Sequence, residues 1–449
     1  MMATRRAALA LTCAALATSC APTAPAAPTE PSTPAAPSVP TAAPTPIAPV
    51  ATSVPTRPVL TVVPTVQEVV PTPAPTPAPA RSLVGVDILL RDGLPLLDAK
   101  RLGLITNATG KTASGQSTID ALNSAFNVGA LFSPEHGIRG DAAAGQAVDA
   151  STDAQTGLPV YSLYGNTTRP TDAMLRGFDA LVYDIQDVGT RTYTYTSTLL
   201  EVMKAAAQHG IPVVVLDRPD PIAGDVVQGN VLDPRFASFV GPAPIAMRYG
   251  MTIGELGQYF NAELHVGAQL HVVQMEGWRR SMWFDETGLD WVNPSPNIRS
   301  LSAAGLYPGT VLFEGTNLSV GRGTEAPFEW LGAPWLDPAD WLSRLTAPGV
   351  HFAIQDRTPD SDAFAGQLCH GLSITVADRG QLQPMALGVA LLCALPNGLK
   401  FDVATFDGLA GTDQVRKQIL AGTPAEQIAA AWQPDLNAFT QKRQPYLIY

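Results

Sequence analysis

The stretch Leu131–Gly140 reads LFSPEHGIRG and gives the clearest single indication of how this chain folds. Its first residues form the apolar end of a predicted strand, and Pro134 then breaks that strand into a polar turn. The turn carries a carboxylate, an imidazole and a guanidinium at Glu135, His136 and Arg139. Open α/β sheets place their functional sites on loops that follow the carboxyl ends of strands. The stretch therefore predicts either a catalytic loop with Glu135 as the acid, or a plain turn in which Glu135 caps the next helix.

Several short apolar segments around this stretch have the pattern of buried parallel strands, each followed by polar residues. The predicted strands cover residues 101–107, 128–132, 179–184 and 211–216, and the predicted helices cover residues 117–126, 196–209 and 252–263. Repeated succession of strand, polar loop and helix is typical of a mostly parallel sheet with helices on both faces. We therefore predict an α/β fold, with a Rossmann-like catalytic domain over residues 81–265.

The predicted strands end in polar side chains, which are Asn107, Glu135, Asp184 and Asp217. Because the carboxyl ends of parallel strands meet at one edge of a sheet, these side chains should line a cleft there. No GxGxxG pattern follows the first strand, so no dinucleotide cofactor is expected. The run Gly110-Lys111-Thr112 is not a phosphate-binding loop, because Ile105 stands where that motif requires its first glycine.

The composition changes after residue 265. Six of the seven tryptophans fall within about 65 residues, at Trp278, Trp283, Trp291, Trp330, Trp335 and Trp341. Predicted helices at residues 338–345 and 384–395 and a predicted strand at residues 372–377 indicate a second, smaller α+β domain. We expect this C-terminal domain, residues 266–449, to complete the cleft. The tryptophans are either platforms for stacking sugars or ordinary core side chains.

The first 80 residues are not expected to belong to the folded domains. Residues 1–20 have the pattern of an export signal, in which small residues precede Cys20 as in a bacterial lipobox. The alternative is a secretory signal with a chance cysteine. Residues 21–80 are rich in alanine, proline and threonine and nearly free of charge, which predicts a disordered, extended linker. We therefore expect an exported lipoprotein, anchored to the membrane through lipid on Cys20.

Composition excludes several other classes of function. The net charge of −11 argues against nucleic-acid binding. The six histidines are scattered and form no HExxH motif, so no metal site is expected, and no GxSxG motif indicates a serine hydrolase. Cys369 and Cys393 lie outside the signal, and the sequence leaves open whether they form a disulfide.

Longer motifs resemble the exo-β-N-acetylmuramidases of the NamZ type, a family once known only as a domain of unknown function. The similar segments are FSPEHGIRG (132–140), GLPVYSLYG (157–165), DIQDVGTRTYTY (184–195), LDRPDP (216–221), MWFDETG (282–288), PSPN (294–297), YPGTVLFEGTN (307–317) and GRGT (321–324). They extend over nearly all of the chain from about Leu83. Three positions depart from the family pattern, because Gln228, Tyr249 and Val320 stand where Glu, His and Glu are expected.

The resemblance implies a glycosidase of cell-wall recycling that releases N-acetylmuramic acid from the non-reducing end of peptidoglycan fragments such as MurNAc-GlcNAc. It also implies a Rossmann-like domain, a smaller C-terminal domain and a site in the cleft between them. The alternative is a lipoprotein that binds cell-wall sugars without cleaving them. Turnover of a muramic acid glycoside would distinguish the two.

Glycoside hydrolysis generally uses two carboxyl groups. The family loop places Glu135 as the principal catalytic carboxyl, in the role of general acid. Glu314, expected directly after an apolar strand, is the first candidate for the second carboxyl, followed by Asp187 and Glu325. The structural alternatives are that Asp184 and Asp187 pair with Arg191 and that Glu325 caps a helix.

Recognition of N-acetylmuramic acid requires a cation for its lactyl carboxylate, and a guanidinium in a motif turn suits that purpose. The candidates are Arg139, Arg191 and Arg322. Further polar residues in the motifs are expected to contact the saccharide, namely His136, Asp184, Tyr193, Tyr195, Asn317 and Glu325. His136 could equally hold the carboxyl of Glu135 in place.

Overall fold

The structure is a computed structural model that describes residues 81–139, 146, 150–395 and 397–449. All of these residues belong to one compact unit that ends at Tyr449. The expected export signal, Cys20 and the linker lie outside the described residues, and so does Gly140 of the LFSPEHGIRG stretch. Within the described part of the chain, no helix has the length and apolar character needed to cross a membrane.

A seven-stranded sheet of order β3-β4-β2-β1-β5-β6-β9 forms the centre of the fold. Its strands are β1 (Arg101–Thr106), β2 (Asn127–Ser133), β3 (Ser151–Thr152), β4 (Pro159–Ser162), β5 (Ala180–Asp184), β6 (Val213–Leu216) and β9 (Leu270–Val273). All neighbouring strands are parallel except β3 and β4 at one edge. The predicted α/β fold with a mostly parallel sheet is confirmed.

The four strands predicted from apolar runs correspond to β1, β2, β5 and β6. The sheet also continues past residue 265, because β9 pairs with β6. The division expected between residues 265 and 266 therefore leaves one strand of the sheet in the second domain. The weaker apolar character of β9, which is only partly buried, gives it no clear strand signal in the sequence.

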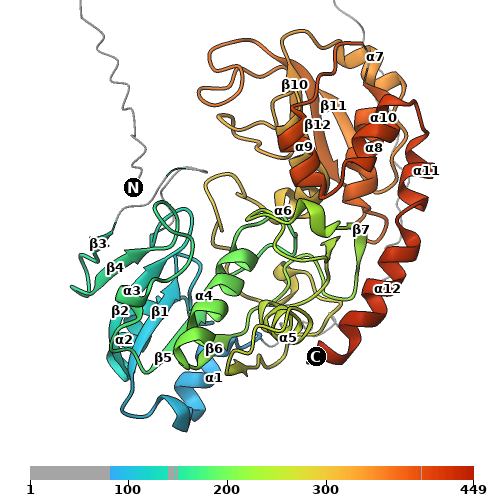
Figure 1. Cartoon of the computed structure of the whole chain (residues 1–449). Helices are drawn as coiled ribbons and strands as arrows, with labels where there is room; N and C mark the ends of the chain where they lie inside the picture. The colour runs from blue at the N-terminus through green and yellow to red at the C-terminus, as the bar shows by residue number, and fades with distance from the viewer. Residues whose placement is uncertain (1–80, 140–145, 147–149, 396) are drawn as a thin grey trace, which may run out of the picture. The chain divides into compact units, whose positions relative to one another are not determined.

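Successive side chains along a strand point to opposite faces of the sheet, so the buried strands contribute to two apolar cores, one on each face. Leu104 of β1 belongs to a core that also includes residues of α1 (Gly85–Asp92) and α2 (Thr118–Ala125). Its neighbour Ile105 belongs to the other core, together with residues of α4 (Tyr195–His209). Figure 1 shows α4 lying against the sheet beside β5 and β6. Both faces are covered, which explains why the strands are nearly continuous apolar runs.

The helices begin and end where local signals predict. In α5 (Ile253–Glu263), Thr252 accepts from the backbone N–H of Glu255 while the Glu255 carboxylate accepts from the N–H of Thr252, which is a complete capping box. The helix α4 ends at Gly210, whose φ of 63° is the left-handed conformation typical of a helix C-terminus. A short helix α3 (Asp172–Leu175) precedes β5.

The C-terminal part of the chain contains a three-stranded antiparallel sheet of order β10-β12-β11. Its strands are β10 (Trp330–Ala333), β11 (Val350–Ile354) and β12 (His370–Val376), and a separate two-stranded sheet is formed by β7 (Gln228–Val231) and β8 (Ala246–Arg248). The remaining α-helices are α6 (Leu301–Thr310), α7 (Pro338–Ser343), α8 (Pro384–Ala394), α9 (Val403–Ala410), α10 (Gln414–Leu420), α11 (Ala425–Ala430) and α12 (Gln433–Arg443). The described residues also form 3₁₀ turns at η1 (Pro95–Leu97), η2 (Pro234–Phe236), η3 (Phe284–Glu286), η4 (Val311–Gly315) and η5 (Gln444–Tyr446). The smaller α+β region expected from the sequence is therefore present.

One expected element is wrong. The apolar run before Glu314 was predicted to be a strand, but it forms the end of α6 and the 3₁₀ turn η4. Ser300 caps α6 by accepting from the backbone N–H of Ala303, and the helix packs closely against α8. A Cβ atom on Gly309 would lie only 1.8 Å from the carbonyl oxygen of Pro384. The apolar residues are thus buried by helix packing, which a short apolar run does not distinguish from a strand.

Candidate active site

Glu135 lies directly after β2, where the chain turns away from the sheet. The turn is made by left-handed backbone at His136 and Gly137, with φ of 72° and 80°. Glu135 itself is only 7% exposed, and its Oε2 accepts a hydrogen bond of 2.7 Å from the Thr194 hydroxyl. Burial raises the pKa of the nearby Tyr164 phenol to about 12, and the charge of Glu135 adds to this rise. These contacts fix the carboxyl group at the end of the strand.

Glu135 faces a cavity of about 380 Å³ whose walls come from both parts of the fold. The loop after β5 contributes Thr192 and Thr194, and the region after α6 contributes Glu314 and Thr316. The other polar lining residues are Tyr164, Tyr307, Ser319, Arg322 and Asp362. Both carboxyl groups that the sequence ranked first therefore lie on one cavity. Its lining contains no tryptophan among the described residues.

Glu314 lies in the turn η4 and pairs with Arg322. Its Oε1 is 2.6 Å from both Nε and Nη2 of the guanidinium. Burial raises the pKa of Glu314, and the negative charges of Asp362 and Glu135 add to that rise, while Arg322 opposes it. The cavity thus holds three carboxyl groups and one guanidinium, which is a strongly acidic composition.

Arg139, a candidate cation for the lactyl carboxylate, forms an ion pair outside the cavity. Its Nη2 donates to Asp153 at 2.6 Å and to Gln155 at 2.9 Å. Asp153 is buried and also accepts from the N–H and hydroxyl of Thr156. Within the described residues, the Arg139 side chain is therefore tied to the segment that precedes β4.

Arg191 is not in the cavity, contrary to its expected role in substrate binding. It has no exposed surface, and its Nη1 and Nη2 donate to four backbone carbonyls, those of Asn230, Ile245, Leu409 and Ala410. Burial lowers its pKa to about 9. The guanidinium joins β7 and β8 to the end of α9. Because it is buried there, it is not accessible to a sugar.

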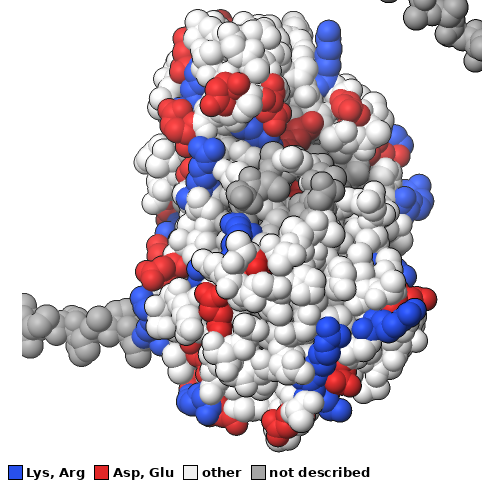
Figure 2. All heavy atoms as spheres, turned by 90° about the vertical axis from the view of Figure 1, so that its left-hand side faces the viewer, with Lys and Arg blue, Asp and Glu red and all other residues white. Residues whose placement is uncertain are grey.

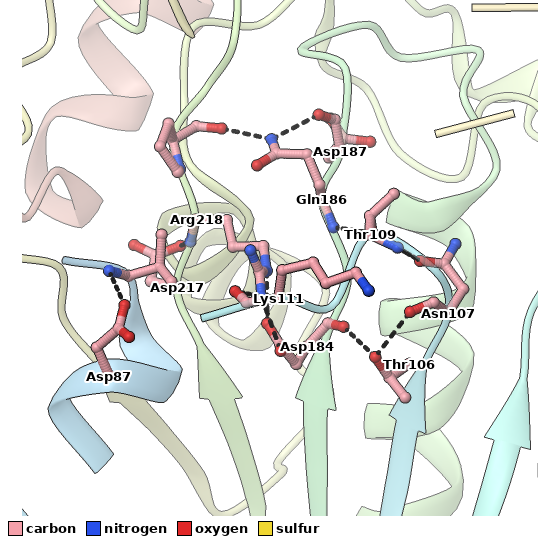
Figure 3. Close-up of polar contacts among 12 residues, drawn as sticks. Asp87, Thr106, Asn107, Thr109, Lys111, Asp184, Gln186, Asp187, Asp217 and Arg218 are labelled. Atoms are coloured by element: carbon pink, nitrogen blue, oxygen red, sulfur yellow. Dashed lines mark hydrogen bonds and ion pairs between the residues drawn. The ribbon is translucent and has the colours of Figure 1, made fainter. Parts of the chain in front are cut away.

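Asp184 does not line the cavity, and the alternative in which Asp184 and Asp187 pair with Arg191 is also wrong. The Asp184 carboxylate is fully buried and forms a bidentate pair with Arg218, at 2.6 and 2.9 Å (Figure 3). Arg218 follows β6, so the two side chains meet because their strands are neighbours. Asp184 and Arg218 lie far apart in the sequence, so sequence analysis does not reveal that they pair.

Asp187 lies in a different buried cluster. Its Oδ2 accepts from the backbone N–H of Gly189 at 2.8 Å and from the Tyr249 hydroxyl. Burial, together with the charge of Asp220, raises the pKa of Asp187 to about 8. Nearby, Gln228 accepts a hydrogen bond from Arg248. Two of the three positions that depart from the family pattern, Gln228 and Tyr249, therefore belong to a buried polar region, whereas Val320 lines the cavity.

The other expected substrate contacts are held by structural bonds. The Tyr195 hydroxyl accepts from Asn107 at 2.7 Å and donates to the Pro294 carbonyl at 2.6 Å. Asn317 binds the loop at residues 398–400 through both ends of its amide. Glu325 is exposed and paired with Arg357. None of these three lines the cavity.

Tyr193 and His136 lie beside the cavity without appearing in its lining. The Tyr193 ring is buried and meets Tyr195 and Tyr307 edge to face, at 4.9 and 5.8 Å between centroids. Since Tyr307 lines the cavity, Tyr193 supports its wall. His136 is buried next to Glu135 at the turn. Among the described residues, no group of three His, Cys, Asp or Glu side chains is placed to hold a metal ion.

Sequence reasoning did not single out Thr194, Tyr164, Tyr307 or Asp362 as site residues. Thr194, Tyr164 and Tyr307 lie inside motifs that the family resemblance rests on, so that signal could have found them. Asp362 lies outside every such motif, on the loop between β11 and β12. Only the fold brings it to Glu314.

Comparison with known proteins identifies the family of this chain. The model of the N-terminal part of exo-β-N-acetylmuramidase NamZ matches residues 102–302, and that of the C-terminal part matches residues 305–449. This chain belongs to the NamZ family. A peptidoglycan β-N-acetylmuramidase NamZ of Bacillus subtilis (strain 168) is 45% identical over 375 residues, which cover 81% of this chain and 91% of that protein.

Two solved structures from Bacteroides fragilis, both of DUF1343 family proteins, have the same fold. The first has a TM-score of 0.75 and 34% identity, and the second a TM-score of 0.68 and 32% identity. Each comparison covers 82% of this chain and 99% of the other. The two NamZ models meet near residue 303, after the last strand of the central sheet.

The tryptophans and cysteines can now be placed. Trp330 and Trp341 have no exposed surface, and Trp278 and Trp283 are nearly as buried, so these four are core side chains. Cys369 is buried and Cys393 is exposed, and both are free thiols.

Figure 2 shows one face of the molecule, on which acidic and basic side chains are interspersed around a mostly uncharged middle.

Proposed function

We propose that the cavity containing Glu135 and Glu314 is the active site at which this NamZ-family glycosidase removes N-acetylmuramic acid from the non-reducing end of peptidoglycan fragments. Family membership makes the chain an exo-β-N-acetylmuramidase, and the alternative of a lipoprotein that only binds sugars is not favoured. The observation that supports the site is that Glu135 and Glu314, which lie nearly 180 residues apart in sequence, both line one cavity.

Glu135 acts as the general acid and Glu314 as the second carboxyl group. A glycosidase requires one carboxyl to donate a proton to the leaving oxygen and another to act, ionised, at the anomeric carbon or on a water. The Thr194 hydroxyl sets the orientation of Glu135, and it can serve both protonation states because a hydroxyl both donates and accepts. Arg322 favours the ionised form of Glu314, in keeping with the second role.

Arg322 is also the best placed of the three candidate arginines to read the lactyl carboxylate. It lines the cavity and uses Nε and Nη2 for Glu314, while its Nη1 forms no hydrogen bond to any described residue. Arg139 and Arg191 are engaged elsewhere. The guanidinium fork can thus hold Glu314 and a substrate carboxylate together.

The protein acts outside the cytoplasm as a lipoprotein. An export signal over residues 1–20, lipid on Cys20 and a proline-rich linker over residues 21–80 support this proposal. An extended linker of that length could reach on the order of 150 Å from the membrane, at about 3.1 Å per residue. A Cys20→Ser variant should move from the membrane fraction to the soluble fraction, and a variant that stays with the membrane would refute the anchor.

The catalytic assignment is tested by Glu135→Gln, which keeps the shape of the side chain but removes the acid. Release of N-acetylmuramic acid from MurNAc-GlcNAc or its para-nitrophenyl glycoside should fall by about 10²-fold or more, the usual contribution of a general acid. The matched control is Glu325→Gln, at an exposed glutamate outside the cavity, which should keep its activity. Retention of activity within about tenfold in Glu135→Gln would remove Glu135 from the mechanism.

A further inference from the structure

A second cavity lies at the carboxyl end of the central sheet and shares no lining residue with the Glu135 cavity. Its volume is about 180 Å³. We call it the switch-point cavity, and its lining comprises residues 109, 111–113 and 115 after β1, Gln186 after β5, Arg218 after β6, and residues 284, 289, 290 and 292. The proposed glycosidase activity makes no use of it.

The order of the strands places the switch-point cavity where open α/β sheets generally bind ligands. After β1, the chain builds β2 and β4 on one side and then returns to add β5, β6 and β9 on the other. The reversal leaves a crevice between the ends of β1 and β5, which is the general position of ligand sites in open α/β sheets. The switch-point cavity lies there, because its walls come from the loops after β1, β5 and β6.

Arg218 supplies a fixed cation to this cavity. The side chain is 5% exposed, and its Nε and Nη2 hold Asp184, while Nη2 also donates to the carbonyl of Lys111 at 2.8 Å. Its Nη1 forms no hydrogen bond to any described residue. Because Asp184 fixes the plane of the guanidinium, the donors of Nη1 are held in place before any ligand arrives (Figure 3).

Lys111 supplies a second cation. Its side chain lies across the carboxyl ends of the strands in Figure 3, and its amine has no ion pair or hydrogen bond within the described part of the chain. The carboxylate at the cavity, Asp290, is 80% exposed and lies 3.7 Å from Arg81, so it faces solvent and its own cation. Since Asp184 balances the charge of Arg218, the net positive charge inside the cavity comes from Lys111.

The remaining wall is apolar and decides which anion fits. Phe284, Leu289, Val292 and Ala113 supply the apolar part of the lining. This cavity pairs two side-chain cations with an apolar surface, which suits a carboxylate that carries a hydrocarbon part. A nucleotide is too large for a cavity of about 180 Å³. We propose that the switch-point cavity binds a small organic acid, with its carboxylate on Arg218 and Lys111 and its hydrocarbon part against Phe284, Leu289 and Val292.

The test is isothermal titration of the full-length protein with propionate, and with inorganic phosphate as the competing anion, at low ionic strength. Propionate should bind saturably with one site per chain. Lys111→Met should weaken that binding by about tenfold or more, the size of a lost charge-assisted hydrogen bond. The matched control Lys100→Met, at an exposed lysine outside the cavity, should bind propionate as the native protein does.

Other results would overturn the proposal. These are an absence of saturable propionate binding, equal affinity in Lys111→Met and the native protein, or saturable binding of phosphate alone. Arg322→Met is included because Arg322 is the cation of the other cavity, and loss of propionate binding in that variant would assign the acid to the Glu135 cavity. Release of N-acetylmuramic acid is measured separately, so failure of this site is distinguishable from failure of the proposed catalytic site.

Discussion

The two glutamates of the proposed active site have different neighbours. Glu135 is oriented by the Thr194 hydroxyl, whereas Glu314 is governed by burial, Arg322 and Asp362. Two carboxyl groups on one cavity thus have different surroundings, which is the usual way for a glycosidase to give them different roles. Thr194 and Asp362 can each be changed without removing either carboxyl.

Thr194→Val keeps the branched shape of the side chain but removes the hydroxyl that donates to Glu135. A hydrogen bond typically contributes about 0.5–1.5 kcal/mol, so kcat should fall roughly 2- to 10-fold while KM changes little. Thr194→Ser should recover most of the activity because it restores the hydroxyl. Steady-state kinetics of both variants check this, and an unchanged kcat in Thr194→Val would show that the contact does not orient the catalytic carboxyl.

Asp362→Asn should change the pH dependence of activity through Glu314. The charge of Asp362 raises the pKa of Glu314, so its removal lowers that pKa. If Glu314 acts in its ionised form, activity appears as pH rises through this pKa, and the acid limb of kcat/KM should move to lower pH. A shift to higher pH would contradict the electrostatic argument.

At the scale of elements, the site depends on where loops leave the strands and on how closely α6 approaches α8. The loops after β2 and β5 bring Glu135 and Thr194 together, since their strands lie on either side of β1. The turn η4 places Glu314 opposite them because α6 is held against α8. Gly309 and Gly388 permit that approach, since each would carry a Cβ atom into the other helix.

Gly309→Ala should therefore destabilise the protein, although alanine is normally the better helix former. Its Cβ would overlap the Pro384 carbonyl, and overpacking in a core typically costs about 1–3 kcal/mol. The matched control is Gly408→Ala in α9, where no atom lies within 4 Å of the added Cβ, and the variant should gain up to about 1 kcal/mol from helix propensity. Thermal unfolding of both variants checks the contrast, and equal Tm values would contradict it.

At the scale of the whole molecule, the fold buries several charged groups that the proposed mechanism does not use. Arg191, with four carbonyl partners, joins β7 and β8 to α9, and Asp184 pairs with Arg218 beneath the switch-point cavity. Asp187 and Asp220 are buried near each other, with pKa values raised by burial to about 8 and about 7. These acids bind protons more tightly in the folded chain than in the unfolded one, so stability should fall as pH rises.

Asp187→Asn tests that dependence. The pKa of Asp187 is about 8 in the folded protein, above the value near 3.9 in the unfolded chain. Between these two pH values the folded state keeps a proton on Asp187 that the unfolded state has lost. The contribution to stability is complete below the unfolded pKa and is lost as pH rises through the folded pKa. The variant should therefore gain Tm relative to the native protein at pH 9, with little difference at pH 4. A larger gain at pH 4 than at pH 9 would reverse the sign and refute the account.

The sequence by itself determined the sheet and the family, and it placed Glu135 at the end of a strand. Strands β1, β2, β5 and β6 are continuous apolar runs because both of their faces are buried, and Glu135 stands out because it follows one of them into a glycine-containing turn. The weaker strand β9 and the helix α6 were missed, because short or mixed apolar segments do not reveal which partner buries them.

The tertiary structure alone decided which of the other motif residues face the cavity. Asp184, Arg191, Tyr195 and Asn317 lie in motifs like those of Glu135 and Glu314, yet each is held by partners distant in sequence. Asp362 has no motif and reaches the cavity on the loop between β11 and β12. Hydrogen bonds and ion pairs form between neighbours in space, and a single sequence records the residue types but not those neighbours.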